Sequence, residues 1–314
     1  MHTSMKVQGF ITTIYMYVLV KLMGGIGSQM LQYSTARCLA LRHNCEVLLD
    51  LSFLDIKQRT DITVRDFELD YFPIKARAAT AAELALSEAY QHSWPHRLVN
   101  KARKLAGLHP RFIYLGEGGD FRDRTDLLAQ APAADILFLK GYWFHEGYFL
   151  PCADQIRQDL AFRPFTDARN QAVADQIAAG TSVSLHVRRG DYLKYSMHGL
   201  CSPAYYEQAV AYLAGHLPTA PTYFVFSDDI AWVRENLPLP GTPVYIDWNK
   251  GAQSIEDVHL MHLCQHQIIA NSSFSWWGGW LNRNPEKIVI CPKLWHAAPP
   301  TPADKVVPPS WVQL

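Results

Sequence analysis

SLHVRRGDYL, residues 184–193, begins as an apolar strand and ends in a cluster of charged side chains. Charged residues that follow a buried strand lie at its carboxyl end, which is where ligands bind in parallel α/β sheets. Two further polar clusters, SDD at residues 227–229 and NSS at residues 271–273, also follow predicted strands. Three clusters at strand ends predict one shared ligand crevice.

Strands and helices alternate on both sides of this segment, as in proteins built on parallel sheets. The alternation is regular after residue 166 and less clear between residues 51 and 110. It predicts an α/β fold made of two halves. We expect strands at residues 14–23, 46–50, 111–115, 135–140, 182–187, 223–226, 244–246, 267–270 and 287–291, and helices at residues 29–44, 80–91, 146–160, 168–179, 203–216, 230–236, 254–264 and 274–281.

Length and composition agree with two globular domains. The chain has 314 residues, of which 49% are hydrophobic and 18% are charged, which is enough apolar material for two cores. FRPF at residues 162–165 is the expected boundary. We therefore divide the chain into residues 16–165 and residues 166–314, the second domain ending in a Pro-rich tail that wraps the surface. Residues 1–15 are expected to be a disordered leader.

Charge and cysteine content exclude several classes of function. The formal net charge is zero, so no overall field attracts nucleic acid. The six cysteines form no C-x-x-C pair and no zinc-type spacing, which indicates a reducing compartment and no structural metal. The apolar run at residues 10–20 is too short to span a bilayer. We therefore expect a cytoplasmic protein, with or without peripheral contact with the inner membrane.

Two adjacent arginines are the first candidates for a binding function. Arg188 and Arg189 follow the predicted strand directly, and guanidinium groups match phosphate oxygens bidentately. Successive side chains diverge at a strand end, so one arginine can hold an anion while the other pairs with Asp191. The alternative is a purely structural ion pair with Asp191.

NSSFSWWGGWLN, residues 271–282, predicts a helix that opens at the crevice. The first amides of a helix bind anions, and Ser272 and Ser273 add hydroxyl donors. Capping of the helix by a serine is the structural alternative. The tryptophans that follow are expected in the core rather than as sugar platforms: Trp276, Trp277 and Trp280.

SIEDVHLM, residues 254–261, contains a carboxylate with two explanations. Ser254 and Asp257 have the spacing of a capping box. Alternatively, the Asp257 carboxylate accepts N–H groups from a purine such as guanine, because it has two acceptor oxygens. Both explanations place Asp257 in the first turn of a helix.

GGIGSQ, residues 24–29, superficially resembles a dinucleotide-binding loop. The third glycine of G-x-G-x-x-G would fall at Met30, so the fingerprint fails and an NAD-dependent oxidoreductase is disfavoured. The glycines still permit close approach of a ligand to the backbone. Asp228 and Asp229 are adjacent rather than spaced as D-x-D, so no Mg²⁺ or Mn²⁺ site is expected.

Five motifs in this order resemble the bacterial α-1,2-fucosyltransferases of glycosyltransferase family 11: GGIGSQMLQY, HVRRGDY, FSDD, SIEDVHLM and NSSFSWWGGWLN. The resemblance covers residues 15–292. It implies a GT-B architecture, in which two Rossmann-like domains face each other across a cleft and the C-terminal one holds GDP-fucose. It also implies inverting transfer of L-fucose to O2 of a terminal β-galactoside, with no metal and no cofactor besides the donor substrate.

The resemblance implies roles for individual residues. Arg188 is expected to grip the β-phosphate of GDP and Asp257 to bind the guanine edge. Arg188 and Asp191 are the catalytic candidates. The donor-binding residues are expected to be His186, Arg188, Arg189, Asp228, Asp257, Ser272, Ser273 and Phe274, and the glycine-rich loop near the reacting centre contains Gly25, Gly27, Ser28 and Gln29.

One departure from the family pattern is Ser28, which stands where the family loop G-G-x-G-N-Q has asparagine. Serine has no amide donors, so we expect a slower enzyme or a water in place of the amide. Asp191 is a candidate general base, although pairing with an arginine would lower its basicity; His145 and Glu146 are weaker candidates. Two alternatives remain open, a fucosyltransferase of α-1,6 or protein O-linked type and a catalytically idle nucleotide-sugar-binding protein.

Overall fold

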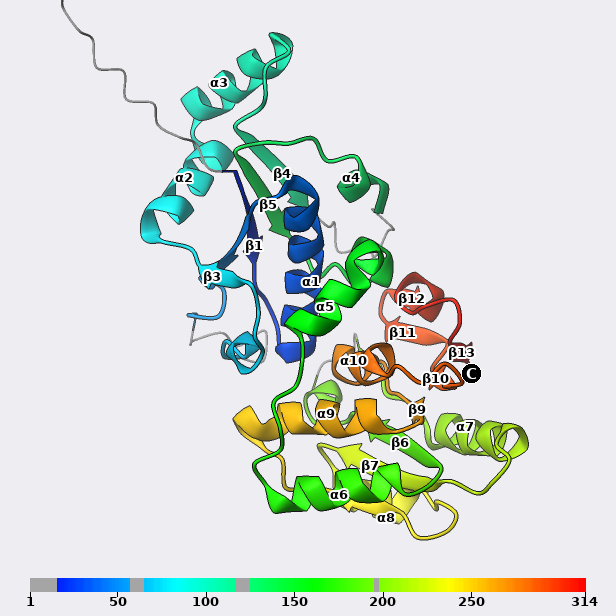
Figure 1. Ribbon diagram of the computed structural model, residues 1–314. Helices are drawn as coiled ribbons and strands as arrows, with labels where there is room; N and C mark the ends of the chain where they lie inside the picture. Colours follow the sequence, from blue (N-terminus) through cyan, green and yellow to red (C-terminus); the bar gives the residue numbers. More distant parts are fainter. Residues whose placement is uncertain (1–15, 57–64, 117–124, 195–197) are drawn as a thin grey trace, which may run out of the picture.

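The computed structural model describes residues 16–56, 65–116, 125–194 and 198–314, so the predicted leader lies outside the described residues. Each half of the sequence forms its own parallel sheet with helices packed around it. Figure 1 shows the two sheets toward opposite ends of an elongated molecule, with helix α10 between them. The prediction of an α/β fold of GT-B type with two Rossmann-like units is confirmed.

The first sheet has the strand order β3-β2-β1-β5-β4, and all its strands are parallel. The chain continues from β1 to β2 on one side, while β5 pairs with β1 on the other. The carboxyl end of β1 is therefore a topological switch point, where ligands bind in such sheets, and the glycine-rich loop follows it. The strands are β1 (Tyr17–Lys21), β2 (Glu46–Asp50), β3 (Ala76–Ala78), β4 (Phe112–Gly116) and β5 (Ile136–Lys140).

The second sheet has the strand order β13-β10-β9-β6-β7-β8 and is also parallel throughout. Here β6 lies between β7 and β9, so the carboxyl end of β6 is the second switch point. Its six residues are all buried, and the polar Ser182, Ser184 and His186 alternate with apolar residues along it. The strands are β6 (Ser182–Val187), β7 (Thr222–Ser227), β8 (Val244–Ile246), β9 (His266–Ile268), β10 (Val289–Cys291) and β13 (Val312–Gln313).

The helices follow the predicted alternation with four differences, one of which is the short helix α4, which was not predicted. Helix α1 begins directly after the extended Gly25, three residues earlier than expected. The single helix expected at residues 146–160 is wrong: two 3₁₀ turns, η2 (Glu146–Tyr148) and η3 (Leu150–Cys152), precede a short α5, because Pro151 has no N–H to donate. The helix α3 was not predicted. The helices are α1 (Ile26–His43), α2 (Ala81–His92), α3 (Trp94–Leu105), α4 (Thr125–Ala129), α5 (Ala153–Asp159), α6 (Ala168–Ala178), α7 (Pro203–His216), α8 (Ile230–Asn236), α9 (Ile255–Leu263) and α10 (Ser273–Leu281).

Helix α10 joins the two halves. It packs against α1 of the first half and α9 of the second, and its tryptophans are buried, as predicted. Trp277 stacks on Phe149 with ring centroids 5.7 Å apart, and the Trp280 indole N–H donates to the Glu146 carboxylate at 3.0 Å. One apolar cluster therefore includes residues from both halves, and separating them would expose it.

The C-terminal tail is more than a surface wrap. It forms the antiparallel pair β11 (Leu294–Ala297) and β12 (Pro300–Pro302) and then adds β13 to the edge of the second sheet. Val306, Val307 and Trp311 are buried, and the Val306 carbonyl accepts the Trp276 indole N–H at 3.0 Å. These apolar residues in a Pro-rich segment explain why the tail packs into the core.

Two cysteines differ from the expectation of free thiols in a reducing compartment. Cys38 of α1 and Cys152 of η3 form a disulfide bond. Four others are free, and Cys264 and Cys291 are buried among apolar residues. Cys38 and Cys152 are 114 residues apart, and no sequence pattern indicated that they would pair, since only the fold brings α1 beside η3.

Candidate active site

The predicted crevice residues meet at the carboxyl ends of β6 and β7. Arg188 follows β6 and makes two ion pairs, one with the Asp191 carboxylate at 2.7 Å and one with the Asp228 carboxylate at 3.1 Å. Asp228, which follows β7, also accepts the backbone N–H of Arg189 at 2.9 Å. A side-chain atom at Gly190 would lie 2.5 Å from the Asp228 carboxylate, so a larger residue there would displace the carboxylate that pairs with Arg188. The guanidinium of Arg188 is thus positioned from two sides.

The two arginines diverge, as predicted for adjacent side chains at a strand end. Arg189 pairs with Asp229 at 3.1 Å and stacks on the Trp232 ring, with its guanidinium carbon 3.8 Å from the ring centroid. It is therefore directed toward α8. Arg188 is the arginine that was predicted to hold an anion, and it is also the one that pairs with Asp191. The sequence alone did not decide which of the two arginines would pair with Asp191.

Asp191 connects the two halves of the protein. Its second carboxylate oxygen accepts from Arg65 of the first half at 2.8 Å. Burial raises the pKa of Asp191, but the charges of Arg188 and Arg65 outweigh it and hold the pKa below its usual value. A carboxylate with a lowered pKa and two guanidinium partners is a weak proton acceptor. Its contacts suit it to orient Arg188.

His186 lies on the buried side of the arginines. The residue is 4% exposed, and its ring centroid lies 5.7 Å from that of Phe274. Burial, and then the charge of Arg188, lower its pKa to about 3, so the imidazole is neutral. In the part of the chain that the structure describes, its Nδ1 atom is buried without a hydrogen-bond partner. An unsatisfied buried nitrogen of this kind is costly unless a ligand or water meets it.

The start of α10 presents the predicted helix N-terminus. Ser272 is the N-cap, and its hydroxyl accepts the Phe274 N–H at 3.3 Å, so the capping interpretation is confirmed. Ser273 and Phe274 are half-buried. Asn271 donates its side-chain amide to the carbonyls of His198, Gly199 and Trp295, which fixes the turn before the helix.

The glycine-rich loop packs directly on this helix start. A side-chain atom at Gly27 would lie 2.6 Å from the Ser273 carbonyl carbon and 2.8 Å from the Phe274 nitrogen. The Gly27 carbonyl accepts the Trp277 indole N–H at 2.9 Å. The loop of the first half and the helix N-terminus of the second half therefore form one surface.

The other loop residues have different surroundings. Gln29 is fully buried and uses its amide within the protein, donating to the carbonyls of Gly24 and Asp66 and accepting the Glu68 N–H. Ser28 is half-buried. A side-chain atom at Gly25 would lie 3.6 Å from the Arg65 side chain. Gln29 therefore holds the loop in place, while Gly25 lies beside the cation that reaches Asp191.

Asp257 occupies the first turn of α9, as both explanations required, but it forms no capping box. Ser254 has helical backbone angles and makes no capping hydrogen bond, because the 3₁₀ turn η5 (Gly251–Ser254) runs directly into α9. Instead, one Asp257 oxygen accepts from the Asn249 amide at 2.8 Å, and Asn249 pairs with Asn170. Burial raises the pKa of Asp257 to about 7. The capping alternative is wrong, because the Asp257 carboxylate bonds to the Asn249 amide and not to the backbone of its own helix start.

Two site residues were missed in the sequence. Arg65 and Glu68 belong to RDFELDYF, residues 65–72, in the stretch whose pattern was least clear. Burial raises the pKa of Glu68, which also accepts the Ile26 N–H at the start of α1. The only sequence feature that could have pointed to these two residues is the run of charged and aromatic side chains in this segment. The weaker base candidates are occupied elsewhere: His145 accepts the Gly147 N–H, and Glu146 accepts from Trp280.

The arrangement combines cations with backbone donors. Arg188 and Arg65 alternate with Asp191 and Asp228, and the start of α10 lies against the glycine-rich loop. Guanidinium groups and helix amides are the donors that proteins use for phosphate groups. The site is therefore suited to an anionic ligand that contacts both halves of the protein.

Comparison with known proteins identifies the family. The family model described as glycosyl transferase family 11 matches residues 114–314. An O-antigen biosynthesis glycosyltransferase, WbnK, from Escherichia coli is 30% identical over 93% of this chain and 99% of its own length. An α-1,2-colitosyltransferase from Escherichia coli is 29% identical over 95% of this chain and 98% of its own length. Human galactoside α-(1,2)-fucosyltransferase 1 is 28% identical over 46% of this chain and 43% of its own length.

Solved structures give weaker likenesses. A mutant of Arabidopsis thaliana FUT1 in complex with GDP has a TM-score of 0.49 at 12% identity, covering 88% of this chain and 70% of its own. The α-1,6-fucosyltransferase NodZ has a TM-score of 0.45 at 14% identity, covering 85% of this chain and 92% of its own. The family match and the full-length relatives carry the assignment: this chain is a glycosyltransferase that belongs to glycosyl transferase family 11.

Proposed function

We propose that this chain transfers L-fucose from GDP-fucose to O2 of a terminal β-galactoside, with inversion at the fucose C1 atom and without a metal ion. The observation that carries the proposal is the placement of Arg188 between Asp191 and Asp228, with Arg65 reaching Asp191 from the other half. The donor diphosphate would lie at Arg188 and at the amides of Ser273 and Phe274. Relatives whose names specify α-1,2 transfer support the linkage.

The chemistry follows from where charge develops. The acceptor O2 atom bonds to C1 and its proton leaves to water, while the bond from C1 to the phosphate oxygen breaks and the β-phosphate gains negative charge. Arg188 and the α10 amides stabilise that charge, and preorganised donors of this kind are usually the largest catalytic contribution. In this scheme Asp191 and Asp228 are positioning residues that hold Arg188, and the neutral His186 lies beside the nucleotide.

The activity test uses GDP-fucose, EDTA and a panel of small β-galactosides, with the product linkage read by NMR. We expect an α-1,2-linked product at a rate that EDTA does not change. Transfer to another hydroxyl would replace the proposed linkage. Binding of GDP-fucose without transfer would identify an idle nucleotide-sugar-binding protein.

A second candidate donor is GDP-colitose, because an α-1,2-colitosyltransferase is similar to almost the whole chain. Colitose is L-fucose without the 3-hydroxyl group, so both donors present the same diphosphate and ring. Competition between the two donors at equal concentration gives the ratio of their kcat/KM values. A ratio that favours GDP-colitose by about tenfold or more, which corresponds to about 1.4 kcal/mol, would make the colitosyl reaction the principal one.

Donor binding should depend on pH through Asp257. The proposed role is to accept the guanine N1–H and N2–H groups, which requires the ionised carboxylate. Its pKa is about 7 in the free protein, so below pH 7 GDP binding must expel a proton. We expect the GDP dissociation constant to rise about tenfold per pH unit below pH 7.

Calorimetric titration with GDP from pH 5.5 to 8.5 measures this slope. Asp257→Asn is the matched control: it should bind GDP weakly and lack the carboxyl contribution, while the phosphate of GDP titrates equally in both proteins. Parallel pH profiles for the two proteins would remove Asp257 from the guanine site.

A further inference from the structure

Helix α3 contacts the rest of the protein through its polar face, and its apolar residues are exposed to solvent. It has no buried residue, and the face that contacts the rest of the molecule is polar. Asn100 accepts the backbone N–H groups of Arg111 and Phe112 and donates to the Phe112 carbonyl at 2.7 Å. His96 packs edge-on against Tyr90, and Arg103 donates to the His109 carbonyl. Residues 96, 100 and 103 recur at helical spacing, so the helix is fixed by one polar stripe.

The opposite face is apolar and lies in solvent. Trp94 is 74% exposed, Leu98 56% and Leu105 81%, and Val99 and Leu108 are also exposed. In an ordinary surface helix the apolar stripe faces the core. Here the pattern is inverted, and several large apolar side chains exposed on one short helix are typical of an interaction surface.

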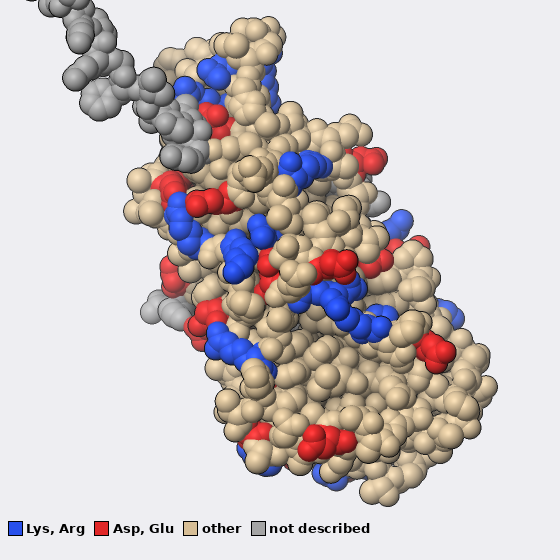
Figure 2. Space-filling model, viewed as in Figure 1, with Lys and Arg blue, Asp and Glu red and all other residues tan. Residues whose placement is uncertain are grey.

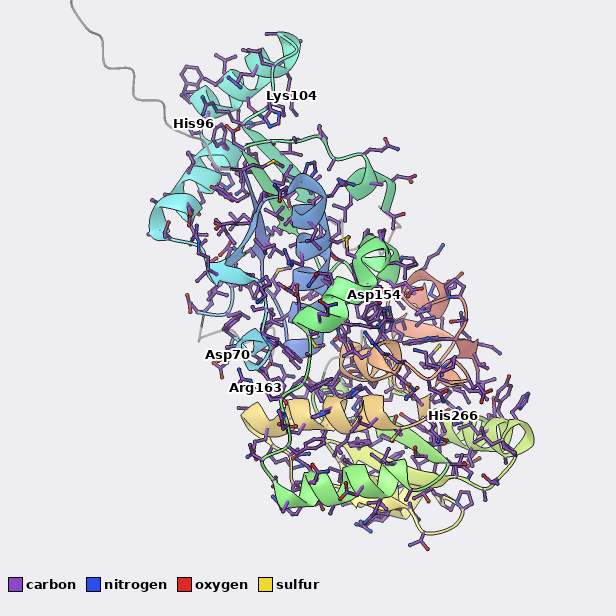
Figure 3. The ribbon with its side chains drawn as sticks, in the orientation of Figure 1. Asp70, His96, Lys104, Asp154, Arg163 and His266 are labelled. Carbon is purple, nitrogen blue, oxygen red and sulfur yellow. A yellow bond between two sulfur atoms is a disulfide. The ribbon has the colours of Figure 1, made fainter. Side chains whose placement is uncertain are left out.

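Basic residues lie on the same helix, next to the exposed apolar residues. Between Glu88 and Glu117 the sequence contains five Lys and Arg residues and no Asp or Glu, in a chain whose net charge is zero. Arg97, Lys101 and Lys104 line a hollow between α3 and β4. Figure 2 shows basic side chains over this end of the molecule, and Figure 3 shows His96 and Lys104 on α3, at the end away from the second sheet.

We propose that α3 docks the protein on an anionic lipid surface, with Trp94, Leu98 and Leu105 in the interfacial region and Arg97, Lys101 and Lys104 at the headgroups. An apolar face bordered by Lys and Arg, with tryptophan at the boundary, is the pattern of helices that lie in a membrane interface. The local positive charge complements anionic lipid and excludes a basic partner. The helix projects from one end of the molecule (Figure 1), which suits a flat surface better than a groove on a partner protein.

The proposed mode is docking at the surface and not insertion across it. In the described ranges no helix is long and apolar enough to cross a membrane. The inference is independent of the proposed transfer reaction, because α3 contributes none of the site residues. Activity toward a small dissolved acceptor therefore reports on the fold of each variant, separately from lipid binding.

Co-sedimentation with vesicles tests the proposal. We expect the full chain to bind vesicles of equal phosphatidylglycerol and phosphatidylcholine, to bind pure phosphatidylcholine weakly, and to dissociate as NaCl rises, because salt shortens the range of charge attraction. Each basic residue near such a surface strengthens binding about fivefold. The double variant Lys101→Gln/Lys104→Gln should therefore bind the anionic vesicles about 25-fold more weakly.

The apolar face has its own variants and control. Leu98→Glu/Leu105→Glu should weaken vesicle binding by at least about tenfold, because two exposed leucines no longer enter the interface. Leu263→Glu/Leu294→Glu adds the same charge at leucines that are 41% and 52% exposed elsewhere, and it should bind like the wild type. Quenching of Trp94 fluorescence by brominated lipid, absent in Trp94→Phe, places the helix at the interface.

Two outcomes would overturn the proposal. One is equal vesicle binding by the Leu98→Glu/Leu105→Glu variant and its control. The other is no vesicle binding together with a concentration-dependent dimer that the same variant abolishes, which would make a second copy of this chain the occupant of the face.

Discussion

Arg188→Ala should lose at least about 10²–10³ in kcat while the protein remains folded. Arg188 is the guanidinium that the site directs toward the proposed diphosphate, and it is held there by Asp191 and Asp228. Its removal takes away a charged donor and leaves two carboxylates facing the leaving group. Asp191 keeps its ion pair with Arg65, so the fold retains that link between the halves. Single-turnover rates with GDP-fucose, together with the melting temperature, separate the two effects.

Arg189→Ala is the matched control, because it removes the same side chain at the next position. Arg189 pairs with Asp229 and stacks on Trp232, so its loss should reduce kcat by no more than about tenfold and affect mainly stability. Arg188→Lys keeps the charge but not the planar fork, and its rate should lie between wild type and Arg188→Ala. Near-normal turnover of Arg188→Ala would remove this residue from the mechanism.

The second half of the fold was predictable because its strands are short, apolar and bounded by clear turns. Strands at residues 182–187 and 244–246 and helices at residues 203–216 and 230–236 lie where the sequence placed them. The first half was less clear for a physical reason. Helix α3 carries its apolar residues outward, so a search for a face directed at the core does not find a partner for it.

Contacts between residues that follow neighbouring strand ends could be predicted from the sequence. Contacts between residues far apart in the sequence could not, because only the fold brings them together. Arg188, Asp191 and Asp228 could be inferred because parallel strands bring their carboxyl ends together. Arg65 is 126 residues from Asp191, and no local pattern indicates that pairing. The Cys38–Cys152 disulfide and the tail strand β13 belong to the same class.

Gly27→Ala should disturb both stability and activity, because there is no room for a side chain where this glycine packs on the start of α10. The added methyl carbon would lie 2.6 Å from the Ser273 carbonyl carbon and 2.8 Å from the Phe274 nitrogen, and both are backbone atoms. The start of α1 and the start of α10 must then move apart, which lengthens the hydrogen bond from the Trp277 indole N–H to the Gly27 carbonyl. We expect the free energy of unfolding to fall by about 1–3 kcal/mol, as for overpacked cores. The α10 amides should move away from the leaving group, so kcat should fall as well.

Gly25→Ala is the control within the same loop. Gly25 has an extended backbone, with φ −80° and ψ −178°, and the nearest atom to its added methyl would be in the Arg65 side chain at 3.6 Å, an ordinary contact. Its melting temperature should therefore match the wild type, while Gly27→Ala melts several degrees lower. If the two variants melt alike, the contact between Gly27 and α10 does not hold the halves together. A Gly27→Ala protein that is destabilised but turns over normally would show instead that the α10 amides are not part of the catalytic site, since moving them would have left the rate unchanged.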